Sequence, residues 1–561
     1  MSKNILIGGE AGQGLKTISS ILGKTLFRMD YHVFSSKNYM SRIRGGHNFI
    51  KIRFDDKKVN SPADELDMIV ALNEETIDLH KDELKENGLV LFDEEREIEG
   101  IGKKIPARDI ASEINIKGLN TVYVGAVLKL LGLKLDSCKK VIREFFEDDQ
   151  LIDDNLKLLN KGYQEMEEKF DILPAEQEKD QLFINGNEAI GLGAVMAGVK
   201  YYTAYPMSPS TGILNYIAGK QDELGIAVEQ AEDEIGAINM ALGASYGGIR
   251  SMTGTSGGGL ALMAEAVGLA GITETPLVIA EVQRPGPATG LPTRTEQGDL
   301  QFAVNISQGE FPLMVISPRD QEDAFYQTFR AHNLAEKYQL PVIILSDQFL
   351  ADSAKNVDEF DIDDLEINRH MITDEEAKEI DNYNRYEFTG DGISPRAYPG
   401  QIPGGVVLAD SDEHNQHGNI IEDAETRVKM VDKRRKKLDK LINEDLKEPE
   451  FIGAENINYL LVGWGSTYGP LTEARELLLE DGYQTGCLSF SDLYPLPEEK
   501  ITEWSEKDVE IIVVENNATG QFARLITGET GIEIDENILK YDGRPFTGEE
   551  IYQRCKKEVI K

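Results

Sequence analysis

The hydrophobic positions of the chain fall into short continuous runs separated by amphipathic stretches. Near the N-terminus, "NILIGG" predicts a buried strand, and the following "LKTISSILGKTLF" predicts an amphipathic helix. Two further runs, "MIVALN" (68–73) and "GLVLFD" (88–93), have the unbroken apolar character of parallel strands that are buried on both faces. Residues 1–170 are therefore predicted to form a β/α domain.

A second β/α series follows a charged, proline-containing linker at 171–181. Between residues 182 and 352, six short apolar runs alternate with helical patterns, which predicts a doubly wound parallel sheet. The pattern breaks down over a connecting segment, 353–450, and residues 451–561 resume it with "INYLLVGWGST" and "DVEIIVVENNATGQF". The predicted fold class is α/β, with several doubly wound parallel-sheet domains.

The excess of acidic over basic residues disfavours some classes of binding partner. The chain has 561 residues, of which 99 are acidic and 59 basic, giving a formal charge of −40. Such a surface disfavours nucleic acids and anionic membranes, since binding phosphates needs Lys and Arg. The basic run "RVKMVDKRRKKLDKLI" (427–442) is interpreted as a solvated helix face, with packing on an acidic neighbour as the alternative. No run reaches the roughly 18 apolar residues of a membrane span, and a cytoplasmic location is expected.

The number and spacing of the cysteines argue against a metal cluster bound by this chain. Its three cysteines, Cys138, Cys487 and Cys555, lie far apart, and none forms a C-x-x-C pair. That spacing supports neither a disulfide framework nor an iron–sulfur or zinc site. Any metal cluster that the protein uses must therefore belong to another chain.

A first glycine loop, "GGEAGQG" (8–14), lies between the first strand and the first helix. The order of its glycines differs from the dinucleotide fingerprint, and no P-loop lysine follows. Either an anion site or a plain tight turn is consistent with it, and Arg42, Arg44 and His47 of the nearby "SRIRGGHNF" are candidate anion contacts. This loop keeps open the alternative of a non-redox nucleotide-binding module.

The second β/α series concentrates polar residues in loops that follow its strands. "AYPMSPSTG" (204–212) indicates a helix start with Ser208 as the N-cap. Glu234 opens another helix, where Ile238 and Ala241 place it on the apolar stripe. A carboxyl group in that position needs to be protonated or tightly hydrogen-bonded, as a group that shares a proton with a ring nitrogen would be.

Two more loops complete this region. "GTSGGG" (254–259) joins a strand to a helix, and "QRPGPATGLPTRTEQGD" (283–299) is a long loop. The long loop carries these polar candidates: Arg284, Thr289, Thr293, Arg294 and Thr295. Because ligands bind beyond the carboxyl ends of the strands in an open parallel sheet, the four loops are expected to converge on a pocket for a carboxylate.

These motifs resemble a known family. "NGNEAIGLGAVMAGVKYYTAYPMSPST", "EQAEDEIGAINMALGAS" and "GPATGLPTRTEQGDL" resemble the alpha subunit of the 2-oxoacid:ferredoxin oxidoreductases, which use thiamine diphosphate. "GGEAGQG…SRIRGGHNF" resembles their gamma subunit, fused in front as in two-subunit 2-oxoglutarate-type enzymes, and "GDGISPRAYPG" and "DSDEHNQHG" match that type. The resemblance implies a gamma-type domain, a pyrimidine-binding-type domain and, from "VVENNATGQFARLI", a transketolase C-terminal-like domain.

The resemblance also implies roles for individual residues. Ser208, where the family usually has threonine, would contact the 2-oxoacid, Arg284 would bind its carboxylate, and Thr293 would supply a second hydroxyl. Glu234 would contact the aminopyrimidine ring of thiamine diphosphate, and Thr255 and Ser256 would be further cofactor contacts. The implied reaction is oxidative decarboxylation of a 2-oxoacid with coenzyme A, which yields acyl-CoA, carbon dioxide and reduced ferredoxin.

The resemblance further implies a second chain. "GDG" at 390–392 mimics a metal-diphosphate motif, but it follows "NYNRYEFT" rather than a buried strand. Mg²⁺, the diphosphate and a [4Fe-4S] cluster are therefore assigned to a beta subunit, which is also expected to bind ferredoxin, in an α2β2 assembly. The expected substrate is 2-oxoglutarate, with pyruvate or a branched-chain 2-oxoacid as alternatives. A complete transketolase-like transferase without a redox step is the rival within enzymes.

Overall fold

The computed structural model describes residues 2–40, 45–93, 102–175 and 180–560. The chain divides into two compact units, which are described separately. Unit 1 comprises Met1–Ile184, Ser353–Glu359 and Thr547–Glu550, and unit 2 comprises Asn185–Asp352, Phe360–Phe546 and Ile551–Lys561. Two candidate anion contacts, Arg42 and Arg44, lie outside the described residues. Within the described ranges, no helix is long and apolar enough to cross a membrane.

Unit 1 is built on an eight-stranded sheet in the order β6-β5-β4-β1-β3-β2-β14-β7. The strands are β1 (Lys3–Glu10), β2 (His32–Asn38), β3 (His47–Asp55), β4 (Leu66–Ala71), β5 (Leu84–Asp93), β6 (Gly102–Ile105), β7 (Gln181–Asn185) and β14 (Ala354–Asp358). β1, β4, β5 and β6 run parallel, as the continuous apolar runs predict, whereas β3 pairs antiparallel with both β1 and β2. The sheet is therefore mixed. Along its whole length β3 alternates between buried and partly exposed positions, so it carries no apolar run.

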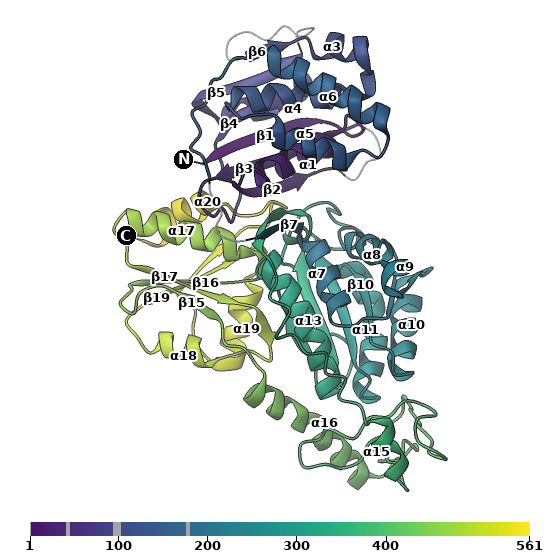
Figure 1. Cartoon of the computed structure of the whole chain (residues 1–561). Coiled ribbons are helices and arrows are strands. Elements are labelled where there is room, and N and C mark those ends of the chain that lie inside the picture. The colour runs from purple at the N-terminus through teal and green to yellow at the C-terminus, as the bar shows by residue number, and fades with distance from the viewer. Residues whose placement is uncertain (1, 41–44, 94–101, 176–179, 561) are drawn as a thin grey trace. The chain divides into compact units, whose positions relative to one another are not determined.

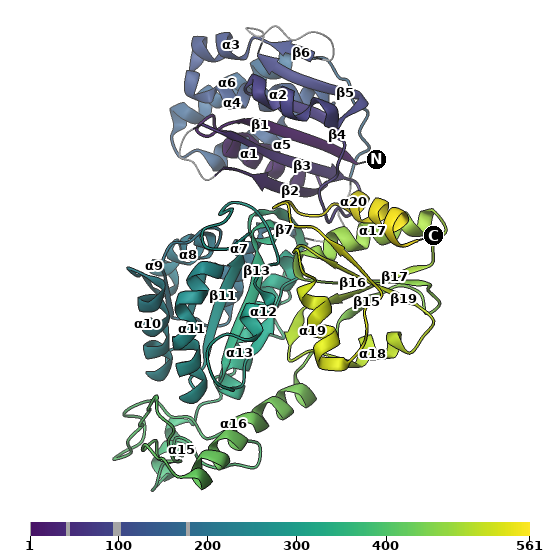
Figure 2. The same ribbon diagram turned by 180° about the vertical axis from the view of Figure 1, so that it is seen from behind.

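Helices cover both faces of this sheet. The main core packs on one face (Figure 1), and α2 (Glu74–His80) lies over the other (Figure 2). The helices of the main core are α1 (Leu15–Phe27), α3 (Ala107–Ile114), α4 (Leu119–Leu130), α5 (Asp136–Phe145) and α6 (Asp149–Gln164). The α1 helix has the bounds that its amphipathic pattern predicts.

Unit 2 contains a seven-stranded sheet in the order β18-β12-β13-β11-β10-β8-β9. The strands are β8 (Tyr201–Ala204), β9 (Ala227–Gln230), β10 (Ser251–Thr255), β11 (Leu277–Gln283), β12 (Met314–Ile316), β13 (Pro341–Asp347) and β18 (Asp492–Tyr494). All of them are parallel except β18, which pairs antiparallel with β12. Every residue of β10, β11 and β13 is buried, which explains why β11 and β13 appear as largely apolar runs.

Helices sandwich this sheet as well. α7 (Gly186–Met196) packs against α13 (Gln321–Tyr338), and a separate core joins the sheet to α10 (Glu234–Tyr246) and α11 (Gly257–Ile272). The doubly wound arrangement expected for this part of the chain is thus present (Figure 1). Shorter helices of unit 2 are α8 (Thr211–Ala218), α9 (Gln221–Leu224), α12 (Leu300–Val304) and α14 (Gln348–Asp352).

The last part of unit 2 forms a five-stranded sheet in the order β15-β17-β16-β19-β20. Its elements are β15 (Glu450–Ile452), β16 (Tyr459–Trp464), α17 (Tyr468–Glu480), β17 (Thr485–Phe490), α18 (Glu499–Ser505), β19 (Glu510–Glu515), α19 (Gln521–Thr530) and β20 (Glu536–Leu539). Trp464, Phe490 and Phe522 belong to the same hydrophobic core as Ile279 and Leu345 of the seven-stranded sheet. The two sheets of unit 2 therefore share one core.

The connecting segment contains α15 (Asp374–Glu379) and α16 (Ala424–Glu444) and is held by buried ion pairs. Lys433 and Lys437 of α16 both bind the carboxylate of Glu274, which has no exposed surface. Burial alone would raise the pKa of Glu274, but these lysines hold it below its usual value. The solvated-face interpretation of the basic run is wrong on this side of the helix, where the cations neutralise an acid of the core.

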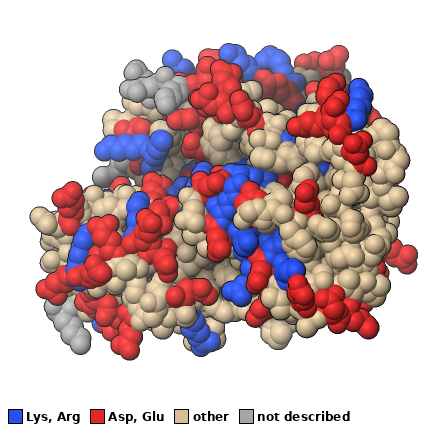
Figure 3. All heavy atoms as spheres, turned by 90° about the horizontal axis from the view of Figure 1, so that it is seen from below, with Lys and Arg blue, Asp and Glu red and all other residues tan. Residues whose placement is uncertain are grey.

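A second buried cluster holds the same segment. Glu336 of α13 pairs with three arginines, one from the sheet domain, Arg250, and two from the segment, Arg369 and Arg396. Seen from below, basic side chains gather in a stripe among acidic ones on the side where α15 and α16 lie (Figure 3). Basic side chains of the connecting segment thus hold it to the rest of unit 2 by pairing with buried carboxylates.

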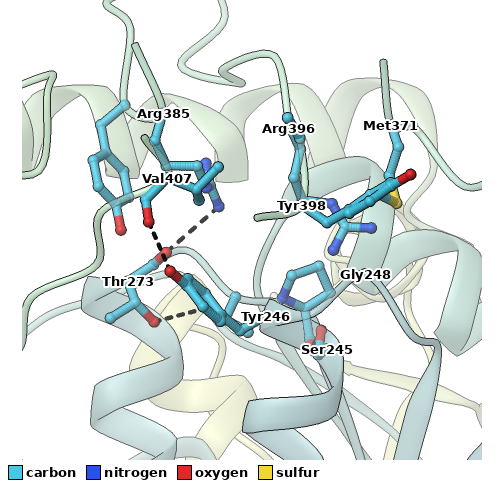
Figure 4. A pocket seen from close by; sticks show the side chains of 13 residues that line it. Ser245, Tyr246, Gly248, Thr273, Met371, Arg385, Arg396, Tyr398 and Val407 are labelled. Atoms are coloured by element: carbon cyan, nitrogen blue, oxygen red, sulfur yellow. Dashed lines mark hydrogen bonds between the residues drawn. The ribbon is translucent and has the colours of Figure 1, made fainter. Parts of the chain in front are cut away.

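A small cavity marks the junction between α10 and the connecting segment (Figure 4). Its volume is about 10 Å³, and Tyr246 Oη donates a hydrogen bond across it to the Val407 carbonyl at 2.7 Å. Arg385 donates to the carbonyl of Glu274 at 2.6 Å beside it. Since this volume admits at most one water molecule, the junction is a packing seam rather than a ligand site.

We expect Glu274→Gln to lower the free energy of unfolding of the connecting segment by about 3–5 kcal/mol, because two buried lysines lose their counter-charge. Urea titration with pulse proteolysis, monitoring cleavage within residues 405–450, measures the change. The matched control is Glu425→Gln, which breaks only the exposed i,i+4 pair with Lys429 and should shift stability by less than about 1 kcal/mol. Equal midpoints for the two variants would contradict the assignment.

Candidate active site at the carboxyl edge of the central sheet

The polar residues singled out in the sequence gather where the parallel strands of unit 2 end. The turn 205–210 follows β8, "TSGGG" (255–259) starts at the last residue of β10, and the long loop 284–299 follows β11. Glu234 begins α10, just after β9. The expected convergence of four loops at one edge of the sheet is therefore observed, at the position where open α/β sheets bind ligands.

Ser208 and Arg284 are in direct contact. Arg284 Nη1 donates a hydrogen bond to the Ser208 carbonyl oxygen at 2.7 Å, and Ser208 itself is exposed. Burial lowers the pKa of the Arg284 guanidinium, while the carboxylates of Asp299 and Glu234 oppose that change. A half-buried cation at the mouth of the site, tied to the backbone by one of its nitrogens, is suited to bind a substrate carboxylate.

The expectation that Ser208 caps a helix is wrong. Residues 208–210 form a turn, and α8 begins at Thr211 with Ser210 at the N-cap position. The Ser210 hydroxyl donates to the Met207 carbonyl at 2.8 Å, so it stabilises the turn rather than the helix. Freed from capping, the Ser208 side chain lies on the surface beside Arg284.

Glu234 is a buried carboxyl group with an unused acceptor. It is 4% exposed, and its Oε1 has no hydrogen-bond partner among the described residues. Ile238 and Ala241 beside it are fully buried, as the apolar stripe predicts, and Asp233 caps the helix by accepting from Gly236 N at 2.6 Å. An orphaned buried carboxylate oxygen calls for a donor from outside the chain, such as a ring nitrogen of a ligand.

The glycines of "TSGGG" make room for carboxyl groups. A Cβ atom on Gly259 would lie 2.8 Å from Glu234 Oε1, and one on Gly257 would collide with the carboxylate of Asp299. Thr255 and Ser256 are completely buried, and the Ser256 hydroxyl, at the N-cap of α11, makes no hydrogen bond within the described part of the chain. This loop therefore holds side chains close together and leaves the Ser256 hydroxyl unpaired at the start of α11.

The long loop is closed at its base and fixed at its far end. Asp299 N donates to Gln283 Oε1 at 3.0 Å, which joins the two ends of the loop. Of the hydroxyls expected to face a ligand, Thr293 is buried, Thr289 is exposed, and Thr295 donates to Asp347 at 3.3 Å. Thr295 is thus a structural contact rather than a free ligand group.

Gln297 fixes the loop to the five-stranded sheet. Its Nε2 donates to the Trp464 carbonyl at 2.9 Å, and its Oε1 accepts from Asn516 N at 3.0 Å. Its backbone N–H donates to the Asn516 carbonyl at 2.7 Å, and its carbonyl accepts from Asn517 Nδ2 at 3.1 Å. Sequence analysis missed Gln297, because its partners lie more than 160 residues away.

Three carboxyl groups near Arg284 were also missed. Glu281 is completely buried in β11, and Asp299 and Glu296 belong to the long loop. Burial and the nearby Asp299 raise the pKa of Glu296 to about 7. The available signal was the single charged residue in "LVIAEVQ", since an acid in a fully buried strand needs a specific reason.

The N-terminal glycine loop, in unit 1, forms a tight turn. Gly12 and Gly14 have φ values of 95° and 76°, and Gln13 Oε1 accepts from Glu10 N at 2.8 Å. His47, a candidate anion contact, bonds through its Nε2 to His80 Nε2 at 2.8 Å. The turn interpretation of this loop is therefore supported by the protein's own side chains.

Comparison with known proteins places the whole chain. Residues 192–433 match the family model described as pyruvate flavodoxin/ferredoxin oxidoreductase, thiamine diphosphate-binding, and residues 4–165 match pyruvate ferredoxin/flavodoxin oxidoreductase. The 2-oxoacid:ferredoxin oxidoreductase subunit alpha of a Sulfolobus species is 32% identical over 99% of this chain and 96% of its own length. The 2-oxoglutarate oxidoreductase subunit KorA of Mycobacterium tuberculosis is 28% identical over 98% of this chain and 90% of its length.

A solved structure is similar over its full length. The 2-oxoglutarate:ferredoxin oxidoreductase from Magnetococcus marinus, with 2-oxoglutarate, coenzyme A and succinyl-CoA bound, superimposes with a TM-score of 0.92 and 32% identity, covering 100% of both chains. The sequence-based recognition and the α/β fold class are thereby confirmed.

We expect Gln297→Leu to loosen the loop 284–299, because Asn516 N–H loses its acceptor at a cost of about 1–3 kcal/mol. Hydrogen–deuterium exchange of the loop peptides should accelerate, while exchange in unit 1 stays unchanged. Gln308→Leu, on an exposed loop of unit 2, is the matched control. Unchanged exchange in the Gln297 variant would show that the loop is held by other contacts.

Proposed function

The chain belongs to the family of 2-oxoacid:ferredoxin oxidoreductase alpha subunits, and we propose that 2-oxoglutarate is its substrate. In this reaction a 2-oxoacid is oxidatively decarboxylated with coenzyme A to an acyl-CoA, and ferredoxin takes up the electrons. One observation carries the proposal. At the carboxyl edge of the sheet, the buried carboxyl group of Glu234, which has an unpaired oxygen, lies close enough to the half-buried cation of Arg284 to interact with it electrostatically. The similar enzyme from Magnetococcus marinus, with 2-oxoglutarate bound, supports this substrate over pyruvate and branched-chain 2-oxoacids.

The residues around Glu234 fit thiamine diphosphate. Its free Oε1 would accept a hydrogen bond from a ring nitrogen of the aminopyrimidine, and Thr255 and Ser256 would line the same wall. When bound, thiamine diphosphate supplies the nucleophilic carbon and the electron sink that decarboxylation of a 2-oxoacid requires. Glu234 holds and moves a proton at the ring, and its burial keeps water from competing for that proton.

Arg284 would orient the substrate. Its guanidinium keeps donors beyond the one used by the Ser208 carbonyl, so it can grip a carboxylate while fixed in place. Ser208 and Thr293 would contact the rest of the 2-oxoacid. The smaller Ser208 side chain, in place of the family's usual threonine, leaves room for one extra methyl group there.

The proposed partner is a beta subunit that covers α10 and α11. Both helices are largely apolar, and Ile235, Met240 and Leu262 are 50%, 44% and 52% exposed on their outer faces. Exposed apolar helix faces beside a ligand site are typical of a subunit interface. α10 begins at Glu234 and α11 begins directly after Ser256, so the same partner would also close the site.

That partner would carry the metals. Among the described residues, no group of three or more His, Cys, Asp or Glu could hold a metal ion, and the three cysteines are buried and separate. Asp391 of the "GDG" motif binds Lys440 at 2.8 Å, which fits a structural role. We place Mg²⁺ and the [4Fe-4S] cluster on the beta subunit of a cytoplasmic α2β2 enzyme, where ferredoxin would also dock.

The reconstituted two-chain enzyme tests the substrate and the role of Arg284 together. With a viologen dye as acceptor, we expect 2-oxoglutarate to give the highest kcat/KM among 2-oxoglutarate, pyruvate and branched-chain 2-oxoacids. Arg284→Ala should raise KM for 2-oxoglutarate by about 10- to 100-fold, the equivalent of one charge-assisted hydrogen bond. Arg524→Ala, at an exposed arginine of the same unit, is the control. A KM unaffected by Arg284→Ala would overturn its assignment, and nucleotide binding by the isolated chain would favour the nucleotide-binding module.

Glu234→Gln should lower kcat by about 10²- to 10⁴-fold with little change in KM, because an amide cannot exchange the proton that the carboxyl group holds. Nuclear magnetic resonance of hydrogen–deuterium exchange at C2 of the bound thiamine ring measures that step directly. Exchange at the wild-type rate in the variant would refute the role. Glu310→Gln, an exposed carboxyl group of the same unit, is the control.

A further inference from the structure

Glu281 is an acid built into the centre of the seven-stranded sheet. It lies in β11 between Thr255 of β10 and Leu345 of β13, and it is 0% exposed. Strand alternation places its side chain on the same face as Ile279, towards the core shared with α10 and α11. Both of its carboxyl oxygens lack a hydrogen-bond donor among the described residues.

Asp299 faces Glu281 at the base of the long loop. The two carboxyl groups are within hydrogen-bonding reach of each other, and Asp299 Oδ2 also has no donor within the described ranges. The position of the Asp299 carboxylate depends on Gly257, where any side chain would collide with it. Two ionised carboxylates offer only acceptors, so a close buried pair is stable only when it holds a proton.

The charged groups around the pair belong to the substrate loop and to α10. Arg284 acts on Asp299, Asp299 acts on Glu296, and Glu234 of α10 acts on Arg284. Thr255 and Leu345 flank Glu281 on the adjacent strands, and Gly257 lies against Asp299; none of these three titrates in the range of the carboxyl groups. The charge of the Glu281–Asp299 pair therefore sets how strongly Arg284 is attracted to the protein's own carboxylates rather than to a bound anion.

We propose that Glu281 and Asp299 share a single proton, so that Arg284 has one negative charge behind it instead of two and stays free to bind the substrate carboxylate. Glu281 is then a positioning residue, which acts on the substrate only through Asp299 and Arg284. This inference rests on the proposed role of Arg284.

The shared proton makes both the stability of the fold and the affinity for the 2-oxoacid depend on pH. Burial first, and then Asp299, raise the pKa of Glu281 well above its usual value. Since the folded chain keeps a proton that the unfolded chain releases near pH 4.3, the pair's contribution to stability falls as pH rises above that value towards the folded pKa. Once the proton is lost, the second negative charge opposes Arg284, and the affinity for the 2-oxoacid falls.

Infrared spectroscopy of the full chain detects the shared proton without any assay of activity. The carbonyl stretch of a protonated carboxyl group, identified by its shift in deuterium oxide, should be present at neutral pH and should lose intensity in Glu281→Gln. Glu310→Gln should leave the band unchanged. An unchanged band in the Glu281 variant would mean that Glu281 is ionised, and the proposal would be overturned.

Kinetics of the reconstituted enzyme test the link to Arg284. Burial and Asp299 raise the pKa of Glu296 to about 7, so this group would also change charge over the pH range of the assay. The enzymes with and without Glu281→Gln are therefore compared in a Glu296→Gln background, which removes that group. In this background KM for the 2-oxoacid should rise about tenfold at alkaline pH, and adding Glu281→Gln should abolish the rise while the pH profile of kcat is retained. A persisting rise in KM would overturn the proposal.

The two arms separate the possible failures. If Arg284→Ala leaves KM unchanged while Glu281→Gln removes the infrared band, the shared proton stands and the substrate role of Arg284 fails. If Arg284→Ala raises KM but the infrared band is unchanged, the substrate role stands and the shared proton fails.

Discussion

The hydrogen bonds of Gln297 join the long loop to the five-stranded sheet, and the geometry of the candidate site depends on them. The side chain of Gln297 uses both of its polar ends, on Trp464 and on Asn516. Because the two sheets of unit 2 also share one hydrophobic core, the loop is held between parts that pack as a single body. Arg284 at the start of the loop and Asp299 at its end are positioned by that attachment.

Although the chain as a whole is strongly acidic, two of its buried carboxylates are surrounded by basic side chains. The chain carries a formal charge of −40, yet buried Glu274 and Glu336 are surrounded by cations of the connecting segment and its neighbours. The candidate site has the opposite arrangement: Glu234 and Asp299 act on Arg284, and Glu281 and Glu296 interact with Asp299. Breaking either arrangement leaves an uncompensated buried charge, so these clusters fix where the segment and the loop must lie.

Sequence patterns predicted the parts of the fold that are set by local periodicity. Continuous apolar runs located β1, β4, β5, β11 and β13, and the glycine turn and amphipathic pattern located α1. They did not predict the antiparallel pairing of β3, because pairing direction depends on chain connections rather than on the pattern within one strand. The same limit applies to α16, whose lysines look solvated until Glu274, some 160 residues earlier in the chain, is brought beside them.

The site was predictable to the extent that each group stands at the end of a strand or after it. This rule located Ser208, Glu234, Thr255, Ser256, Arg284 and Thr293 at one edge of the sheet. It could not locate Glu281, which lies within a strand and acts through a loop residue 18 positions later.

The structure also explains why glycines occur in "TSGGG". None of its glycines needs a positive φ; two of them are needed because Glu234 and Asp299 occupy the space where their side chains would be. A motif that looks like a cradle for an anion is, in this chain, a means of packing two carboxyl groups against a helix start. Under the proposed function, the remaining free groups there, Glu234 Oε1 and the Ser256 hydroxyl, are satisfied only when cofactor and partner chain are both in place, so the site is completed by assembly.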